Sequence, residues 1–202
     1  RAAAFTARLA AGADASGGSS AEVVERLAVM SLRLTDAMVL AEPAEADKRE
    51  STVAQLLYEL QTAAAEYRIG YLKFFSDQVI ASVDPNEDTE SSVERLTEFA
   101  LRVRAICETL FARHQAPLAF RIGIDVGPAV GSLVGAEKRS FAFWGEAVQA
   151  AGIMADTSLP GTIQVTETVY EELREKYLFQ LRGHHYLEQV GEFSTYLLGG
   201  QL

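Results

Sequence analysis

Hydrophobic residues along this chain recur with two periods, and the period changes from segment to segment. Four short apolar runs have the length and the β-branched or aromatic content of strands, at 27–34, 71–75, 78–83 and 118–124. Two longer segments place apolar residues three or four positions apart, which predicts amphipathic helices over 50–68 and 91–110. The order strand, helix, strand, strand, helix, strand predicts an α+β fold with a ferredoxin-like βαββαβ core.

The two predicted helices each carry an apolar face, and turn residues separate the strands. The face of the first helix comprises Val53, Leu56, Leu57, Leu60, Ala64 and Tyr67, and that of the second Val93, Leu96, Ala100, Val103, Cys107 and Leu110. Ser91 and Glu94 have the spacing of a capping box, which predicts that the second helix begins there. The dipeptide Ser76-Asp77 predicts a tight hairpin between the second and third strands.

Further elements are expected on both sides of this core. Beyond it we expect a separate strand over 129–135, a helix around 146–155, a turn at Pro160-Gly161 and several shorter strands. The Gly/Ser/Ala-rich stretch 12–20 predicts a linker, so that 1–20 form a short helical piece with its linker and 21–202 a domain. Because the chain begins with Arg1 and lacks the apolar run of a signal peptide, we expect a segment of a longer protein.

Charge and cysteine content exclude several kinds of partner. With 18 basic and 28 acidic residues the net charge is −10, which disfavours nucleic acid and anionic membrane surfaces. No apolar run is long enough to cross a membrane, so membrane attachment is expected only through parts of a parent chain outside this sequence. The single cysteine, Cys107, rules out an internal disulfide and suits a reducing, cytoplasmic compartment. At an apolar helix position we expect it to be a buried, unreactive thiol.

Four segments of the second half resemble, in order and spacing, the catalytic domain of class III adenylate and guanylate cyclases. They are "RIGIDVGPAVGSLVG" (121–135), "FWGEAVQAAGIM" (143–154), "LPGTIQVTETVYEEL" (159–173) and "RGHHYLEQVGEFSTYLL" (182–198). The resemblance runs from about residue 27 to the end. It implies the class III nucleotidyl cyclase fold, with strands and helices added after the core. It also implies conversion of ATP or GTP to a cyclic nucleotide and pyrophosphate, at the interface of a homodimer or a heterodimer.

The resemblance also implies two divalent metal ions, Mg²⁺ or Mn²⁺, held by two aspartates. "KFFSD" (73–77) is similar to the family motif K-x-x-G-D and maps Asp77 onto one of them. "SLRLTD" (31–36) is similar to the end of the family's first strand and maps Asp36 onto the other. Two alternatives stay open: Asp77 is a common hairpin-turn residue for conformational reasons, and Asp36 suits a solvated loop.

Two basic residues match nucleotide-binding positions of the family. Arg121 corresponds to an arginine that contacts the triphosphate, a role for which a planar guanidinium is well shaped. Lys73 corresponds to the lysine that hydrogen-bonds the purine base. The alternatives are a strand arginine paired with surface acids and an outward-facing strand lysine.

Other positions depart from the family pattern. The base-reading partner of the lysine lies two residues before the Trp-Gly pair, where this chain has Ala142. The family's transition-state asparagine and arginine, five and nine residues after that tryptophan, correspond to Gln149 and Ile153. Isoleucine cannot stabilise charge on a phosphoryl group, and loss of one such donor costs roughly 10²–10³ in rate.

Two loops that contact phosphate in the family are altered as well. The loop after the first metal aspartate is "AMVLAEP" (37–43), with Val39 where a glycine is expected and an added negative charge at Glu42. Near the end, "EQVG" (188–191) stands where the family has K-G-K-G, so Glu188 or Val190 replaces a phosphate-binding lysine.

These observations favour a degenerate cyclase domain, catalytically weak or inactive, that acts as a regulatory or dimerisation module. The first alternative is an active nucleotidyl cyclase, alone or as the metal-binding half of a heterodimer. In such a pair one chain supplies the metal aspartates and the phosphate arginine, and the other supplies the base-reading and transition-state residues. The second alternative is a non-catalytic module that senses a nucleotide in the former active site.

Overall fold

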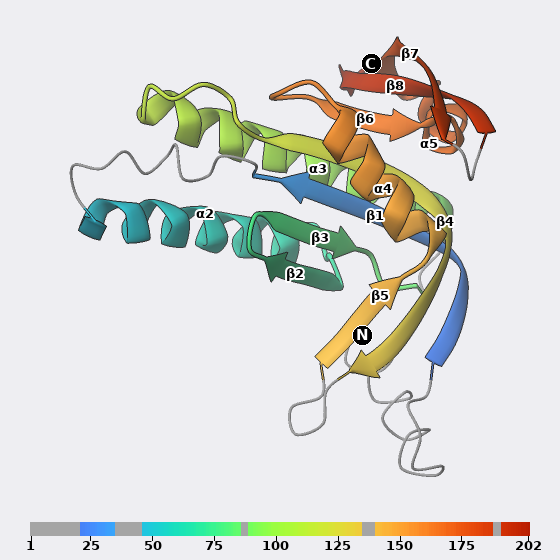
Figure 1. Ribbon diagram of the computed structural model, residues 1–202, viewed down its shortest axis with the longest axis horizontal. Helices are drawn as coiled ribbons and strands as arrows, with labels where there is room; N and C mark the ends of the chain where they lie inside the picture. The colour runs from blue at the N-terminus through green and yellow to red at the C-terminus, as the bar shows by residue number, and fades with distance from the viewer. Residues whose placement is uncertain (1–20, 35–45, 86–88, 135–139, 188–190) are drawn as a thin grey trace.

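The computed structural model describes residues 21–34, 46–85, 89–134, 140–187 and 191–202. A single mixed sheet with the strand order β2-β3-β1-β4-β6-β8-β7 runs through the molecule, and β5 adds to the far end of β4 (Figure 1). The strands are β1 (Ala21–Arg33), β2 (Tyr71–Phe75), β3 (Gln78–Ser82), β4 (Arg121–Val134), β5 (Ser140–Trp144), β6 (Ile163–Thr166), β7 (Tyr177–Leu187) and β8 (Gly191–Gln201). The helices are α2 (Ala46–Glu66), α3 (Thr89–Arg113), α4 (Glu146–Thr157) and α5 (Glu167–Leu173).

The predicted core is confirmed: β1, α2, β2, β3, α3 and β4 follow one another as a βαββαβ unit. The two central strands, β1 and β4, are antiparallel, and β3 lies antiparallel on the other side of β1. The only parallel pair among the described strands joins β4 to β6. It extends the core into the strands and helices that follow it.

The two faces of the sheet carry different helices. Helices α2 and α3 pack against one face, where alternate residues of the central strands, such as Met30 and Leu32 of β1, are fully buried. Helix α4 crosses the opposite face over β1 and β4 (Figure 1). There Val29, Ile80 and Ala151 belong to a second, smaller buried cluster. The larger cluster is the main core, and the smaller one holds α4 in place.

The apolar face of α3 is confirmed, because all six of its predicted residues are buried, Cys107 included. Burial raises the pKa of the Cys107 thiol to about 12, which leaves it without a reactive thiolate at neutral pH. The predicted start of this helix is wrong. The helix begins at Thr89, so Ser91 lies inside the first turn and is not the N-cap. On α2, Val53 is exposed (39%), contrary to prediction, while Leu56, Leu60 and Ala64 are buried.

Two predictions about the second half are also corrected. Residues 129–135 do not form a separate strand, because β4 continues from Arg121 to Val134. Pro128 is tolerated within it because it lies opposite the register shift between Val24 and Leu27 of β1, where the regular hydrogen-bond ladder is interrupted. The strands at the end are not short: β7 and β8 have 11 residues each and form a long antiparallel pair. Helix α5, between β6 and β7, was not predicted.

Residues 1–20, predicted to be a helical piece and a linker, lie outside the described residues. The first described residue, Ala21, already belongs to β1 and pairs with Ser132 of β4. None of the helices in the described ranges combines the length and the apolar character needed to span a bilayer.

Candidate functional site

The candidate site lies on the sheet face that α4 partly covers, at the end where β1 and the β2–β3 hairpin finish. Side chains alternate between the two faces of a strand, so the neighbours of core residues point to this face. On β4, Ile122 is in the main core, and Arg121 therefore projects to the α4 side. On β2, Leu72 and Phe74 pack against the main core, and Lys73 projects to the α4 side as well. The structure thus places both candidate nucleotide-binding residues on one face.

The hairpin between β2 and β3 positions Asp77. Phe75 pairs directly with Gln78, so Ser76 and Asp77 form a two-residue turn, as predicted. Ser76 has a φ of 50°, in the left-handed region that a glycine adopts without steric cost. This is the position of the glycine in the family motif, so the turn keeps the backbone shape without the residue that suits it best.

The carboxylate of Asp77 is exposed at the tip of this hairpin. The backbone carbonyl of Asp77 accepts a hydrogen bond of 2.7 Å from the amide of Leu34, which ties the tip to the end of β1. Asp36, the other predicted metal ligand, lies outside the described residues, as do 37–43 and 188–190 with Val39, Glu42, Glu188 and Val190.

The metal-binding capacity of the described part of the chain is limited. It contains no group of three or more His, Cys, Asp or Glu side chains that could hold an ion together. Asp77 offers one exposed carboxylate, a ligand type that Mg²⁺ and Mn²⁺ accept alongside water and substrate phosphate. The described residues therefore do not form a complete metal site by themselves, and two-metal binding remains what the family resemblance implies.

Lys73 and Ala142 come from strands that contact each other. The rings of Tyr71 and Phe143 meet edge to face with centroids 5.1 Å apart, which brings β2 against β5. The Lys73 ammonium group lies 5.8 Å from the centroid of the Tyr71 ring, a cation–π distance, and burial lowers the pKa of Lys73. Ala142, next to Phe143, contributes only a methyl group. Of the two positions that the resemblance maps to base reading, one therefore keeps its lysine and the other lacks a hydrogen-bonding side chain.

Gln149 and Ile153 lie on the side of α4 that faces away from the sheet. The buried residues of this helix are Ala147, Ala151, Gly152, Met154 and Ala155. Gln149 is exposed and Ile153 half-buried, one helical turn apart. Within one chain these two positions therefore point away from the face that carries Lys73 and Arg121. The structure therefore separates Gln149 and Ile153, as one set, from Lys73 and Arg121, as the other, and does not bring the two sets together.

An ion pair that the sequence did not suggest joins β1 to α4. The guanidinium group of Arg33, the last residue of β1, donates from Nε to Oδ1 of Asp156 (2.8 Å) and from Nη2 to Oδ2 (3.3 Å). Arg33 is also the direct cross-strand neighbour of Arg121. Two residues 123 positions apart in sequence meet here, so no local pattern could have indicated the contact.

A second unpredicted feature is Asp125, a buried carboxyl group on β4. Its Oδ1 accepts a hydrogen bond of 2.6 Å from the hydroxyl of Thr166, at the start of α5. Burial raises the pKa of Asp125 to about 6; the Thr166 hydrogen bond opposes this shift and the charges of Glu146 and Glu172 add to it. Asp125 lies on the α4 side of the sheet, two residues from Gly123 and one from the core residue Ile124. In the sequence, Asp125 could have been noticed as a single acidic residue within the apolar strand "RIGIDVG".

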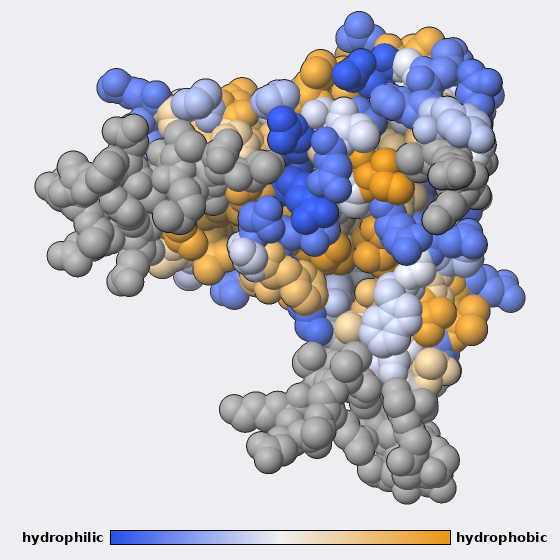
Figure 2. Space-filling view, viewed as in Figure 1, coloured by the Kyte–Doolittle hydropathy of each residue, from blue (hydrophilic) through white to orange (hydrophobic). Residues whose placement is uncertain are grey.

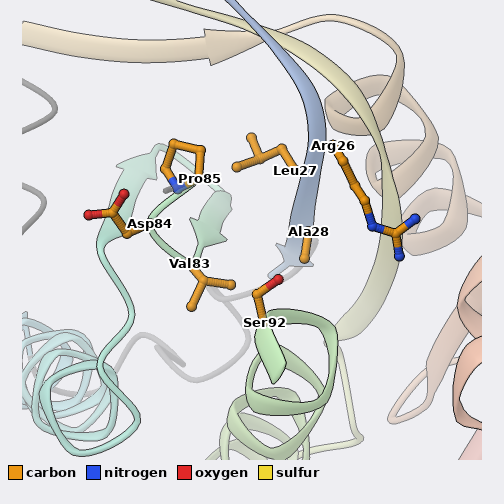
Figure 3. Close-up of a pocket in the computed structure, with 7 residues that line it drawn as sticks. All are labelled: Arg26, Leu27, Ala28, Val83, Asp84, Pro85 and Ser92. Carbon is orange, nitrogen blue, oxygen red and sulfur yellow. The ribbon is translucent and has the colours of Figure 1, made fainter. Parts of the chain in front are cut away.

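A small hollow lies between β1, the end of β3 and the start of α3 (Figure 3). It is lined by Arg26, Leu27, Ala28, Val83, Asp84, Pro85 and Ser92. It encloses about 180 Å³, including its open mouth. Its interior leaves no room even for a water-sized molecule, so this hollow cannot hold a nucleotide.

The fold agrees with that of one protein family. Residues 20–200 match the model of the "Adenylate and Guanylate cyclase catalytic domain". The match covers nearly the whole chain, and the chain therefore belongs to this family. The resemblance inferred from the four sequence segments is confirmed, and so is the fold class.

Curated relatives share about a third of their aligned residues with this chain. An adenylate cyclase of Mycobacterium tuberculosis is 32% identical over 108 residues, which are 54% of this chain and 24% of that protein. Retinal guanylyl cyclase 1 of Bos taurus is 30% identical over 128 residues, 61% of this chain and 12% of that protein. The matched part of this chain thus corresponds to a quarter or less of the length of these relatives.

Solved structures confirm the fold. The adenylyl cyclase CyaB from P. aeruginosa superposes with a TM-score of 0.80 at 18% identity, covering 89% of this chain and 96% of that one. The guanylate cyclase domain of RhGC from Catenaria anguillulae, solved in complex with GTP, gives a TM-score of 0.78 at 20% identity, covering 90% and 100%. At these identities the likeness shows a shared fold.

Proposed function

We propose that this class III cyclase domain has lost most or all of its catalytic activity and works as a regulatory and dimerisation module. The observation that carries this proposal is Ile153 on the open side of α4, at the position of the family's transition-state arginine. Charge that develops on a phosphoryl group needs a preorganised donor, and an isoleucine side chain has none. The loss of one such donor costs about 10²–10³ in rate.

Two further positions support the proposal. Ala142, next to the Tyr71–Phe143 contact, cannot form the second hydrogen bond to a purine base. Gln149 keeps an amide, but its side chain is one methylene longer than that of asparagine, which displaces the amide from a preorganised geometry. The three changes affect both binding of the base and stabilisation of the transition state, so each of them lowers the rate of the same reaction.

The geometry of the two sets of residues supports a dimer. Gln149 and Ile153 point away from the face that carries Lys73 and Arg121, so one chain cannot bring both sets to one substrate. A second cyclase-type domain is needed to complete the site, as the family's dimeric arrangement implies. A domain that keeps this arrangement without turnover can still transmit a conformational change between partners. The cytoplasmic location expected for the domain remains a prediction.

The test is a cyclase assay with Mn²⁺ and ATP or GTP at high protein concentration, run beside Asp77→Ala. The expected result is product at background level for both proteins, while sedimentation shows a folded dimer. Product from the parent that disappears in Asp77→Ala would overturn the proposal, because it would show a working metal site. Glu175→Ala, an exposed acid in the turn after α5, is the matched control for the loss of one negative charge.

A second candidate is the metal-binding half of a heterodimeric cyclase. The observation that favours it is that Asp77 is retained at the tip of the β2–β3 hairpin and Arg121 on the α4 side of β4, whereas the polar residues expected at Ala142 and Ile153 are absent. Mixing this chain with a domain that carries the base-reading and transition-state residues tests it. Product above the sum of the separate domains, lost with Asp77→Ala, supports this candidate over the first.

A further inference from the structure

We propose that one side of the β7–β8 hairpin docks a basic segment of another protein, whose arginine side chains stack on tyrosine rings. This surface carries two pairs, each made of a tyrosine and a glutamate. They are Tyr186 with Glu192, which are cross-strand partners, and Tyr196 with Glu167 of α5. We call this surface the tyrosine–glutamate face.

The tyrosine–glutamate face lies on the side of the sheet opposite α4. Side chains alternate along β8, so Glu192, Ser194 and Tyr196 project from one side of the strand. Tyr196 packs against the main core, which lies on the side of the sheet away from α4. Lys73 and Arg121 project to the α4 side, so this face is separate from the candidate nucleotide-binding positions.

The first pair is open to solvent. The side chain of Tyr186 is 72% exposed, and Glu192 is exposed as well. Directly opposed side chains have Cβ atoms about 4.5–5.5 Å apart, so a guanidinium group at this carboxylate is within reach of the ring. There it gains a cation–π contact and a charge-assisted hydrogen bond together. Figure 2 shows hydrophobic and hydrophilic residues side by side at the top of the view, where Figure 1 places β7 and β8.

The second pair is held in place by α5. Tyr196 stacks on Tyr170 of this helix, with ring centroids 3.8 Å apart and an angle of 5° between the rings. Burial raises the pKa of the Tyr196 hydroxyl and the charge of Glu167 raises it further, because that carboxylate lies nearby. Leu181, the direct cross-strand partner of Tyr196, is 53% exposed. It offers an apolar surface to the aliphatic stem of an arginine.

Charge selects the kind of partner. Glu171, a further acid near Tyr196, is paired with Arg174 at 3.2 Å. Glu167 and Glu192 have no ion-pair partner among the residues that the structure describes, so their charges are available to a partner. The chain has a net charge of −10, which repels an anionic membrane, a nucleic acid and a second copy of the chain. A basic protein segment is the complementary occupant.

The spacing of the two pairs defines the segment further. Glu192 and Tyr196 are four residues apart on β8, which corresponds to about 13–14 Å along the strand. An extended peptide has the same rise per residue, so arginines at positions i and i+4 lie on one side of it at this spacing. Arginine is preferred over lysine, because its planar guanidinium group stacks on a ring and donates to a carboxylate at the same time.

The experiment is an NMR titration of the whole chain with the peptide Arg-Thr-Ser-Thr-Arg, capped at both ends. The peptide Arg-Arg-Ser-Thr-Thr has the same composition and charge but adjacent arginines, and Glu-Thr-Ser-Thr-Glu has the opposite charge. Tyr186→Ser removes one ring of the face and Glu192→Gln removes one charge. Their matched controls lie on α2: Tyr58→Ser, at a tyrosine that is 70% exposed, and Glu66→Gln, at an exposed acid.

We expect Arg-Thr-Ser-Thr-Arg to shift the amide signals of β8, and Tyr186→Ser and Glu192→Gln each to weaken its binding about threefold to fivefold. Tyr58→Ser and Glu66→Gln should leave the affinity unchanged. The peptide with adjacent arginines should bind more weakly, and the acidic peptide should not bind. Affinity should fall as NaCl is raised, because the contact is electrostatic.

Several results would overturn the proposal. Attraction by net charge alone would weaken binding equally in Glu192→Gln and Glu66→Gln and would not respond to Tyr186→Ser. No shift of the β8 signals at millimolar peptide would show that the face does not bind basic segments. Self-association that is lost in Tyr186→Ser would assign the face to a second copy of the chain. Binding to phosphatidylserine vesicles that is lost in Tyr186→Ser would assign it to a membrane.

These outcomes are separable from those of the cyclase assay, because the face is on the other side of the sheet from the candidate nucleotide-binding positions. A catalytically active parent would overturn the proposed loss of activity and leave the tyrosine–glutamate face intact. A Tyr186→Ser variant with unchanged peptide affinity would remove the docking proposal and leave the proposed function intact.

Discussion

Gly123 of β4 lies directly beneath Ala151 of α4. A Cβ atom at residue 123 would lie 2.1 Å from the carbonyl oxygen of Ala151 and 2.3 Å from the amide nitrogen of Ala155. Both of these are backbone atoms, which cannot rotate away as a side chain can. The close contact of helix and sheet therefore depends on the missing side chain, and this contact sets the height of Gln149 and Ile153 above the sheet.

We therefore expect Gly123→Ala to destabilise the domain by at least about 3 kcal/mol, because overpacking of this kind forces the backbone to move. Gly152→Ala, on the same helix, is the matched control: its Cβ would meet no atom within 4 Å. There the better helix propensity of alanine should stabilise by about 0.5–1 kcal/mol. Urea unfolding of the three proteins measures both effects. Equal stability of parent and Gly123→Ala would show that α4 does not pack on β4 in this way.

In the β2–β3 turn we expect a substitution to stabilise the domain, in contrast to Gly123→Ala. Ser76 has a φ of 50°, and the left-handed conformation costs a residue with a Cβ about 1–2 kcal/mol. Glycine removes this cost but loses about 0.5–1 kcal/mol of additional chain entropy on folding. Ser76→Gly should therefore stabilise by about 0.5–1 kcal/mol in thermal or urea unfolding, while Ser76→Ala, which keeps the Cβ, should not. A stabilising Ser76→Ala would contradict the explanation from backbone strain.

What the sequence allowed us to predict was mostly local. The hairpin followed from Ser76-Asp77 between two apolar runs, and the buried face of α3 from its regular spacing. The length of β4 did not follow from the sequence. A proline such as Pro128 normally interrupts a strand, and the register shift in β1 that accommodates it is visible only in the structure. Contacts between distant residues left no pattern at all, as with Arg33 and Asp156.

The residues of the candidate site likewise fall into those that the sequence predicted and those that it did not. Motif spacing gave Lys73, Asp77 and Arg121, and the structure places all three at the predicted strand and turn positions. Asp125 was missed because its partner, Thr166, is 41 residues away and its burial depends on the packing of α4 and α5. A single acid in an apolar strand becomes informative only when the fold shows what covers it.

The buried Asp125 should make stability depend on pH. Its pKa is raised from 3.8 to about 6 in the folded protein, so the folded state holds a proton that the unfolded state has released. Raising the pH through the window from about 4 to 6 therefore destabilises the fold, by up to about 3 kcal/mol when complete. Asp125→Asn keeps an acceptor for the Thr166 hydroxyl and removes the titration. Its stability relative to the parent should rise between pH 4 and pH 7.

The measurement is the free energy of unfolding of both proteins at several pH values, with Glu175→Gln as a control that changes an exposed acid. The stability difference between Asp125→Asn and the parent should grow with pH, and that for Glu175→Gln should stay within about 0.5 kcal/mol. A difference that shrinks as the pH rises would mean that Asp125 is charged and stabilised in the fold. Its pKa would then lie below 3.8, and the burial argument would be wrong.

The proposed loss of catalysis should be partly reversible at one position. Ile153→Arg restores a guanidinium on the open side of α4, where the half-buried isoleucine leaves room for a longer side chain to reach solvent or a partner chain. If the missing donor is the main barrier, product formation with Mn²⁺ should rise by about 10²-fold. Ile153→Met, similar in length and uncharged, should give no gain. The gain should vanish when Asp77→Ala is added, because both groups act on one substrate. A rise that survives Asp77→Ala would come from a contaminating cyclase.

No rise in product formation by a folded dimer would place the barrier elsewhere, at Ala142 or at the altered phosphate loop 37–43. Adding Ala142→Asp to Ile153→Arg would then separate weak base binding from weak phosphate binding.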